Sequence, residues 1–329
     1  MNHSNNDCQI CHNSENNQSY WVREMMFGYR DEFEYFKCAQ CGCLQIKEIP
    51  QNLSKYYPSS YFEKPNKRLL KQQNFWKQFL TKEKNKYLMG KTSMIGSLVN
   101  SFYPEIKKTP VFCGWDWRKD FQSYSLNFQS SILDVGCGHG SLLYYLRQQG
   151  CQNLTGVDPY IEKDIFTEGI KIYKQELADL NAQFDFITLH HSFEHMEDPL
   201  TVLQHLYRLL KNQRYLLIRI PVVSSFAWEK YGVNWCQIDA PRHFYLHTPQ
   251  SLQILAKKVG FTIKDIVYDS TEFQFVVSEK YLKDIPFKDK QNGKTPLFTK
   301  EEVNEFALKA KELNLKKQGD QACFYLYKT

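Results

Sequence analysis

Short apolar runs alternate with segments of helical periodicity between residues 131 and 220. We predict strands at 131–135, 154–157, 170–173, 184–189 and 215–220 and helices at 141–149 and 199–210. Such alternation is typical of βαβ units, which build a parallel sheet covered by helices. The pattern therefore predicts an α/β fold with a doubly wound, Rossmann-like sheet.

The pattern extends on both sides of this region. After a loop region at 221–248 it predicts helices at 249–259 and 300–313 and strands at 261–268 and 323–327. On the N-terminal side, residues 64–91 carry nine Lys or Arg against one acid, Glu83, with apolar residues near helical spacing. We interpret this segment as one or two basic amphipathic helices with a solvated face; an acidic ligand or a membrane surface is the alternative.

Composition and charge narrow the classes of protein. The 329 residues suffice for about two domains, and a hydrophobic content of 42% excludes a disordered chain. A net charge of +6 is too small to indicate a nucleic-acid partner. No apolar run approaches roughly 18 residues, so no membrane span is expected. The start, MNHSNNDCQI, lacks a secretion signal, and we expect a cytoplasmic protein.

Two C-x2-C pairs dominate the N-terminal region: Cys8 with Cys11, and Cys38 with Cys41. Two such pairs match a four-thiolate zinc site with no open position, so we predict structural zinc. His12 and Cys43 are alternative fourth ligands. Acids outnumber Lys and Arg between residues 12 and 37, which disfavours phosphate contacts. We divide the chain into a zinc-ribbon unit (1–50), a basic helical linker or lid (51–115) and the α/β domain (116–329).

A glycine-rich turn follows the first predicted strand of the α/β domain. The segment SILDVGCGHGSLL places Gly136, Gly138 and Gly140 between a strand and a helix, where backbone can approach a nucleotide-like ligand. The spacing G-x-G-x-G differs from the dinucleotide pattern, and the preceding Asp134 suits a cation better than a pyrophosphate. Asp158 ends the second strand, where a carboxylate can accept hydrogen bonds from ribose hydroxyls.

At this point the chain resembles the class I S-adenosylmethionine-dependent methyltransferases, through LDVGCGHG and through FDFITLHHSFEHMEDP at 184–199. The four-cysteine unit and the segment DAPRHFYLHTPQSL are similar to a bacterial subgroup that includes deoxysugar C-methyltransferases. The resemblance implies a seven-stranded sheet and S-adenosylmethionine as cofactor. It implies a small-molecule acceptor, such as a sugar nucleotide or an intermediate of a polysaccharide or natural-product pathway.

The resemblance also implies roles for individual residues. The glycine turn would hold the methionine part of the cofactor, and Asp158 would hold the ribose. Glu176 and Leu177 would lie on the adenine side, with Asp179 as an alternative to them. The cofactor set that we predict comprises Asp134, Gly136, Gly138, Gly140, Asp158, Glu176, Leu177 and His190.

Two groups of residues are candidates for proton removal from the acceptor. The first group follows the fourth strand and comprises His190, His191, Glu194 and His195. The second lies in the loop after the fifth strand and comprises Arg242, His243, Tyr245 and His247. An acid-His pair deprotonates the sugar in the deoxysugar enzymes, but here Arg242 replaces the acid. Histidine suits this work because its ordinary pKa is about 6.5. We predict His243 as the base, with His195 structural or on the cofactor side; a base among residues 190–195 remains the alternative.

Three other functions remain open. An RNA or protein methyltransferase could use the zinc unit for docking, although the segment after the fourth strand, His190-His191-Ser192-Phe193, lacks an Asn-Pro-Pro-Tyr-type motif. A protein that binds S-adenosylmethionine without transfer is the second alternative. A nicotinamide oxidoreductase is the third, and the glycine spacing disfavours it.

Overall fold

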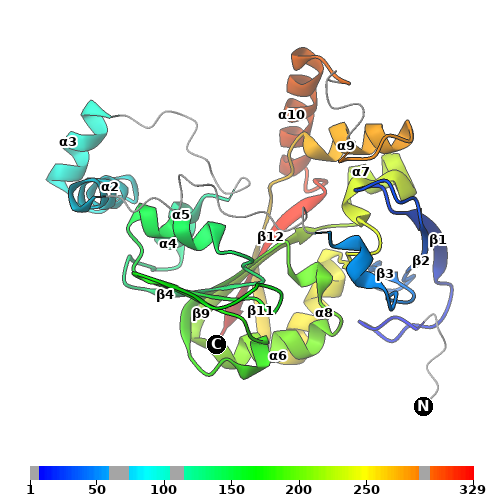
Figure 1. The fold of residues 1–329 in the computed structure, drawn as a ribbon, viewed down its shortest axis with the longest axis horizontal. Helices are drawn as coiled ribbons and strands as arrows, with labels where there is room; N and C mark the ends of the chain where they lie inside the picture. The colour runs from blue at the N-terminus through cyan, green and yellow to red at the C-terminus, as the bar shows by residue number, and fades with distance from the viewer. Residues whose placement is uncertain (1–6, 59–73, 104–114, 289–296) are drawn as a thin grey trace. The chain divides into compact units, whose positions relative to one another are not determined.

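The computed structural model describes residues 7–58, 74–103, 115–288 and 297–329 (Figure 1). The chain divides into two compact units. The first contains residues 1–61, 191–203 and 218–326, and the second contains residues 62–190, 204–217 and 327–329. Each unit combines segments that lie far apart in the sequence, and the division at residues 50 and 115 stays a prediction.

Within the described residues, the main sheet has eight strands in the order β11-β12-β9-β8-β4-β5-β7-β6. Every strand predicted from the sequence is present: β4 (Ser131–Val135), β5 (Asn153–Val157), β7 (Ile170–Tyr173), β8 (Phe184–His190), β9 (Leu210–Pro221), β11 (Phe261–Tyr268) and β12 (Gln321–Lys328). β4 pairs in parallel with β5 and with β8, and β5 pairs in parallel with β7. The α/β prediction is therefore confirmed.

The prediction of seven strands is wrong by one. β6 (Ile165–Thr167) is a three-residue strand that pairs antiparallel with β7 at the edge of the sheet. β6 and β7 are joined by a two-residue turn at Glu168 and Gly169. The turn is possible because Gly169 adopts a left-handed φ of 77°. A strand of this length carries too few residues to show a period in the sequence.

The predicted helices are also present, as α5 (Ser141–Gln149), α6 (Pro199–Leu209), α8 (Pro249–Val259) and α10 (Lys300–Leu315). α8 begins with a capping box between Thr248 and Ser251 and ends at Gly260, whose φ of 101° stops the helix. Three further helices were not predicted from the sequence: α4 (Trp117–Ser123), α7 (Phe226–Tyr231) and α9 (Phe273–Leu282). Of these, α7 lies in the predicted loop region.

The described part of the basic segment, residues 74–91, contains one helix, α2 (Phe75–Leu88), and its first residues, 64–73, lie outside the described part of the chain. A second helix, α3 (Met94–Phe102), follows just beyond the segment. Asn85 of α2 donates a hydrogen bond to the backbone oxygen of Gln149, at the end of α5, across 2.9 Å. α3 approaches α2 closely at Gly96, where a Cβ atom would lie 2.1 Å from the backbone oxygen of Glu83. Among the described helices, none is long and apolar enough to span a membrane.

A second sheet joins the N-terminal region to a segment near residue 245. Its order is β1-β2-β3-β10, with β1 (Gln18–Arg23), β2 (Glu32–Lys37), β3 (Leu44–Ile46) and β10 (Tyr245–Leu246). All three pairings are antiparallel, and β10 places Tyr245 opposite Gln45. The loop that carries Arg242 and His243 is therefore attached to the sheet of the cysteine-rich unit.

Candidate functional site

The glycine turn connects β4 to α5, and its three glycines all have left-handed φ angles: 70° at Gly136, 52° at Gly138 and 81° at Gly140. A Cβ atom at Gly140 would lie 2.3 Å from Cδ1 of Ile172, so both the angle and the space require glycine there. A Cβ atom at Gly138 would meet no atom within 4 Å. The turn is therefore open at Gly138, where a ligand can approach the backbone.

Asp158 binds this turn directly. Its Oδ2 accepts a hydrogen bond from the backbone N–H of Gly138 at 2.8 Å, and its Oδ1 accepts one from the N–H of Tyr160 at 2.9 Å. These two bonds fix the carboxylate at the end of β5, beside the turn. Each oxygen retains a second lone pair, which leaves capacity to accept a hydroxyl hydrogen.

Asp134 is a buried carboxyl group near the end of β4. Its Oδ1 accepts a hydrogen bond from Oγ1 of Thr188, on the neighbouring strand β8, at 3.0 Å. Burial raises the pKa of Asp134 to about 7, against the effect of this hydrogen bond, and the charge of Asp158 raises it further. The protonation state of Asp134 is thus sensitive to a neighbouring charge, and a cation bound beside it would favour the ionised carboxylate.

The remaining residues of the predicted cofactor set lie in the same unit. His190 ends β8, and its ring centroid lies 4.8 Å from that of Trp115. Glu176 is exposed and precedes a 3-10 turn, η2 (Leu177–Asp179), after β7. The sequence did not predict Trp115 as a site residue, because no local pattern indicates a contact with a residue 75 positions later.

The four predicted catalytic residues lie in the other unit, where they form a cluster. Glu194 and His195 belong to the 3-10 turn η3 (Phe193–His195), which begins three residues after β8 ends. The backbone N–H of Phe244 donates to the backbone oxygen of Glu194 at 2.8 Å, which joins the two loops. The rings of His195 and His243 lie 4.6 Å apart, edge to face. The structure therefore brings the candidate residues after β8 and those in the loop before β10 into contact.

Glu194 is completely buried. Its Oε1 lies 3.3 Å from Nδ1 of His191 and 3.9 Å from Nε2 of His243. Burial alone would raise the pKa of Glu194, but the imidazoles of His191, His243 and His195 outweigh burial and lower it to about 2. Glu194 is thus a buried, ionised carboxylate surrounded by histidines.

His243 is buried and neutral. Its Nδ1 lies 2.8 Å from the backbone oxygen of Gln237, so Nδ1 carries the hydrogen and Nε2 carries the free lone pair. Burial lowers the pKa of His243 to about 4, with a further lowering by His195 that Asp239 and Glu194 oppose. At neutral pH the ring is therefore uncharged, and Nε2 has a lone pair available to a hydrogen-bond donor or a cation.

The side chain of Arg242 belongs to a buried charge network. Its guanidinium donates to Asp239 at 2.7 and 2.9 Å and to Glu24 at 2.8 Å. Its backbone oxygen accepts a hydrogen bond from Nδ1 of His195 at 2.8 Å. Arg242 thus connects Asp239, Glu24 and His195 through its side chain and its backbone oxygen. The sequence did not predict Glu24 and Asp239 as partners of Arg242, because no local pattern indicates these contacts.

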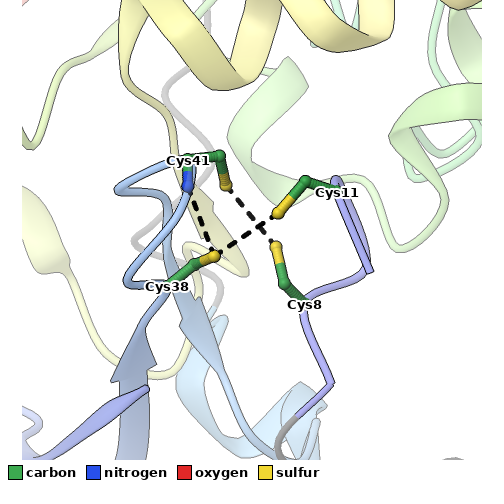
Figure 2. A group of neighbouring side chains, drawn as sticks. All are labelled: Cys8, Cys11, Cys38 and Cys41. Atoms are coloured by element: carbon green, nitrogen blue, oxygen red, sulfur yellow. Dashed lines mark hydrogen bonds between the residues drawn. The ribbon is translucent and has the colours of Figure 1, made fainter. Parts of the chain in front are cut away.

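The four cysteines of the two C-x2-C pairs converge (Figure 2). Their sulfur atoms all lie within 4.8 Å of one another, and two sulfur pairs, Cys8 with Cys41 and Cys11 with Cys38, are 3.5 Å apart. For Zn–S bonds of about 2.3 Å, the sulfurs of a tetrahedral site lie about 3.8 Å apart. The four side chains therefore fit a zinc ion with little movement.

The alternative fourth ligands lie elsewhere. His12 directs Nε2 toward Nζ of Lys258, at 3.3 Å. The sulfur of Cys43 is buried beside the backbone oxygen of Leu44 and Nδ1 of His247, at 3.8 and 3.9 Å. Neither belongs to the cysteine group, so the geometry favours Cys8, Cys11, Cys38 and Cys41.

Comparisons with known proteins identify the family of the chain. The model of the methyltransferase domain family matches residues 98–266. This match, just over half of the chain, includes the glycine turn and the Glu194 cluster but not the cysteine pairs. A ubiquinone biosynthesis O-methyltransferase of Pseudomonas aeruginosa is 25% identical over 154 residues, which are 41% of this chain and 66% of that protein. The mitochondrial ubiquinone biosynthesis O-methyltransferase of Saccharomyces cerevisiae is 33% identical over 124 residues, 33% of this chain and 40% of that protein.

The chain thus spans less than two thirds of the length of these relatives. Among solved structures, a SAM-dependent methyltransferase from Archaeoglobus fulgidus aligns with a TM-score of 0.40 and 20% identity, over 64% of this chain and 92% of that one. The family match rests on the sequence of residues 98–266, where the glycine turn and Asp158 are found. The chain belongs to the methyltransferase domain family and carries an S-adenosylmethionine-dependent methyltransferase domain.

Proposed function

We propose that the protein transfers the methyl group of S-adenosylmethionine to a small molecule, such as a sugar nucleotide or an intermediate of a polysaccharide or natural-product pathway. The observation that carries this proposal is the hydrogen bond between Asp158 and Gly138, which holds a ribose-binding carboxylate beside a glycine turn open to a ligand. The names of the curated relatives, which are small-molecule O-methyltransferases, support the acceptor class.

The residues fit the cofactor. Gly136, Gly138 and Gly140 would hold its methionine part, and Asp158 would accept hydrogen bonds from the ribose hydroxyls. Asp134 would face the positive end of the methionine part, since a neighbouring cation shifts this carboxyl group to its ionised form. Glu176, Leu177 and His190 would complete the adenine side. The bound cofactor supplies an electrophilic methyl group, so the protein mainly has to orient the acceptor and take up its proton.

The Glu194 cluster would perform the proton transfer. His243 presents a free lone pair at Nε2, and the carboxylate of Glu194 lies 3.9 Å away, where it stabilises the imidazolium that forms. His195, fixed by the backbone of Arg242, would shape the acceptor side of the cluster. Arg242 would keep the loop in place through Asp239 and Glu24.

We propose a structural role for zinc in the four-cysteine unit. Zinc bound by Cys8, Cys11, Cys38 and Cys41 would fix the segments that lead into β1 and β3, which have few buried apolar residues of their own. Thr248, at the start of α8, donates a hydrogen bond to the backbone oxygen of Cys41 at 2.7 Å. The zinc unit would therefore also support the segment that follows the loop carrying Arg242 and His243.

A labelling experiment tests the acceptor class. The protein is incubated with S-adenosylmethionine that carries a radioactive methyl group, together with sugar nucleotides, quinol precursors, total RNA or total protein. We expect label in a low-molecular-weight product and none in RNA or protein. Label found only in RNA or protein would overturn the proposed acceptor class, and binding of the cofactor without any transfer would overturn the proposed activity.

A further inference from the structure

The side chains of Glu194, His195 and His243 each direct one potential metal ligand into a common space. One ligand atom from each residue lies within 4.8 Å of the other two. The side chain of Glu194 is completely buried, and among the described residues the one donor near its carboxylate is Nδ1 of His191, 3.3 Å from Oε1. A completely buried carboxylate with a single long contact to a donor is costly, so a further partner of positive charge is expected at this point.

Both imidazoles are oriented as metal-binding histidines are. Nδ1 of His195 donates to the backbone oxygen of Arg242, and Nδ1 of His243 donates to that of Gln237, each at 2.8 Å. A second hydrogen bond of this kind fixes the ring and leaves Nε2 as the atom with the lone pair. The histidines therefore offer lone pairs, not hydrogens, on their remaining ring nitrogens.

The groups around the cluster do not supply the missing positive charge. Asp239 adds a second carboxylate, with Oδ2 at 3.8 Å from Nε2 of His243. The guanidinium of Arg242 is bound by Asp239 and Glu24. His191 approaches Glu194 with Nδ1 at 3.3 Å, and its Nε2 accepts a hydrogen bond from a guanidinium nitrogen of Arg219 at 2.8 Å, so the ring offers Glu194 a single N–H group.

We propose that Glu194, His195 and His243 bind a divalent transition-metal ion, separate from the four-cysteine site. Two nitrogens and one carboxylate suit Mn²⁺, Fe²⁺ or Zn²⁺ and leave coordination positions for water or an acceptor oxygen. With bonds of about 2.1 Å, two ligand atoms on one ion lie at most about 4.2 Å apart, so the side chains need to close by less than about 1 Å.

The proposed ion refines the proposed function of this cluster and gives Nε2 of His243 a different role. A bound cation occupies the lone pair that a free base would use. The acceptor proton would then pass to a metal-bound hydroxide, which forms near neutral pH because the cation lowers the pKa of its water. The metal site itself is measured without cofactor or acceptor, so the two proposals are tested separately.

Mn²⁺ is the appropriate probe, because hard and borderline nitrogen and oxygen ligands bind it while thiolates select zinc. The zinc-loaded full chain is titrated with Mn²⁺, and the free ion is followed by electron paramagnetic resonance. We expect about one bound Mn²⁺ per chain. We expect Glu194→Gln and His243→Gln to weaken binding by about 10- to 100-fold. Glu197→Gln, which changes an exposed carboxylate three residues from Glu194, should bind as the wild type does.

A spectroscopic measurement on the wild-type protein covers the case of a variant that does not fold. Electron spin echo modulation of bound Mn²⁺ should show coupling to imidazole nitrogen. Absence of Mn²⁺ binding, bound Mn²⁺ without nitrogen coupling, or equal binding by all folded variants would overturn the metal site. Mn²⁺ binding with nitrogen coupling in a protein that transfers no methyl group would support the site and overturn only the proposed activity.

Discussion

Arg242 and Glu24 form a completely buried ion pair, with Nη2 of the guanidinium 2.8 Å from Oε1 of the carboxylate, although 218 positions separate them in the sequence. Glu24 also accepts hydrogen bonds from the backbone N–H groups of Phe27 and Tyr29. The carboxylate therefore holds the turn after β1 and the loop that carries Arg242 and His243 at the same time. Through the backbone of Arg242, the pair also determines the orientation of His195.

We expect Glu24→Gln to destabilise the protein by about 3–5 kcal/mol, because it leaves the buried guanidinium of Arg242 with an incomplete set of partners. Asp284→Asn is the control, since Asp284 pairs with Arg23 and Arg30 at an exposed position where solvent screens the charges. Denaturant unfolding, followed by circular dichroism, measures both. Equal stability of the two variants would show that the buried pair does not hold the loop.

The second prediction concerns zinc. We expect about one zinc per chain by metal analysis, and we expect Cys38→Ser to lose it and to unfold at lower denaturant concentration, because binding free energy of a structural zinc is folding free energy. Cys43→Ala should keep zinc, because its sulfur lies outside the cysteine group. Zinc that survives Cys38→Ser but not Cys43→Ala would move the fourth ligand to Cys43.

The third prediction concerns the cofactor. We expect Asp158→Ala to weaken binding of both S-adenosylmethionine and S-adenosylhomocysteine by about 1–3 kcal/mol, through loss of the ribose contacts and of the bond to Gly138. Asp179→Ala, at an exposed position in η2, is the comparison. Calorimetry measures the affinities. A loss at Asp179 with none at Asp158 would place the nucleoside contact after β7.

The fourth prediction concerns catalysis. We expect His243→Gln to bind S-adenosylmethionine normally and to lower kcat for the native acceptor by about 10²- to 10⁴-fold, the usual share of proton transfer. His205→Gln, on α6 and outside the cluster, should leave kcat unchanged. We expect His195→Ala to alter cofactor binding or stability instead. Full turnover by His243→Gln would place proton removal among residues 190–195, or would show that the acceptor needs none.

The fifth prediction concerns stability against pH. Burial lowers the pKa of His247 to about 4, so the unfolded chain takes up a proton at this residue that the folded chain excludes. The corresponding stability is present above about pH 6.5 and is lost as the pH falls toward 4. His247→Phe keeps the stacking on Phe193 but removes the titration. Between pH 7 and 5, we expect the wild type to lose up to about 2 kcal/mol more than the variant in denaturant unfolding.

The sequence by itself predicted the elements whose information is local. The strands of the main sheet contain short apolar or β-branched runs, and Gly260 marks the end of α8 as expected. α9 shows the limit of such patterns: its segment, FQFVVSEKYL, is rich in β-branched and aromatic residues and buries side chains on several faces, so no helical stripe identifies it. The glycine turn and the two C-x2-C pairs were also recognisable, because each needs a fixed spacing of particular residue types.

The tertiary structure alone decided which residues hold the loop that carries Arg242 and His243, and in which direction its side chains present their lone pairs. β10 pairs with β3 across about 200 positions, and Glu24 reaches Arg242 across a similar separation. Which carbonyl accepts from Nδ1 of His195 or His243 determines where each lone pair points. The physical reason is that such partners depend on register and burial between distant segments, whereas periodicity and spacing report only on neighbours along the chain.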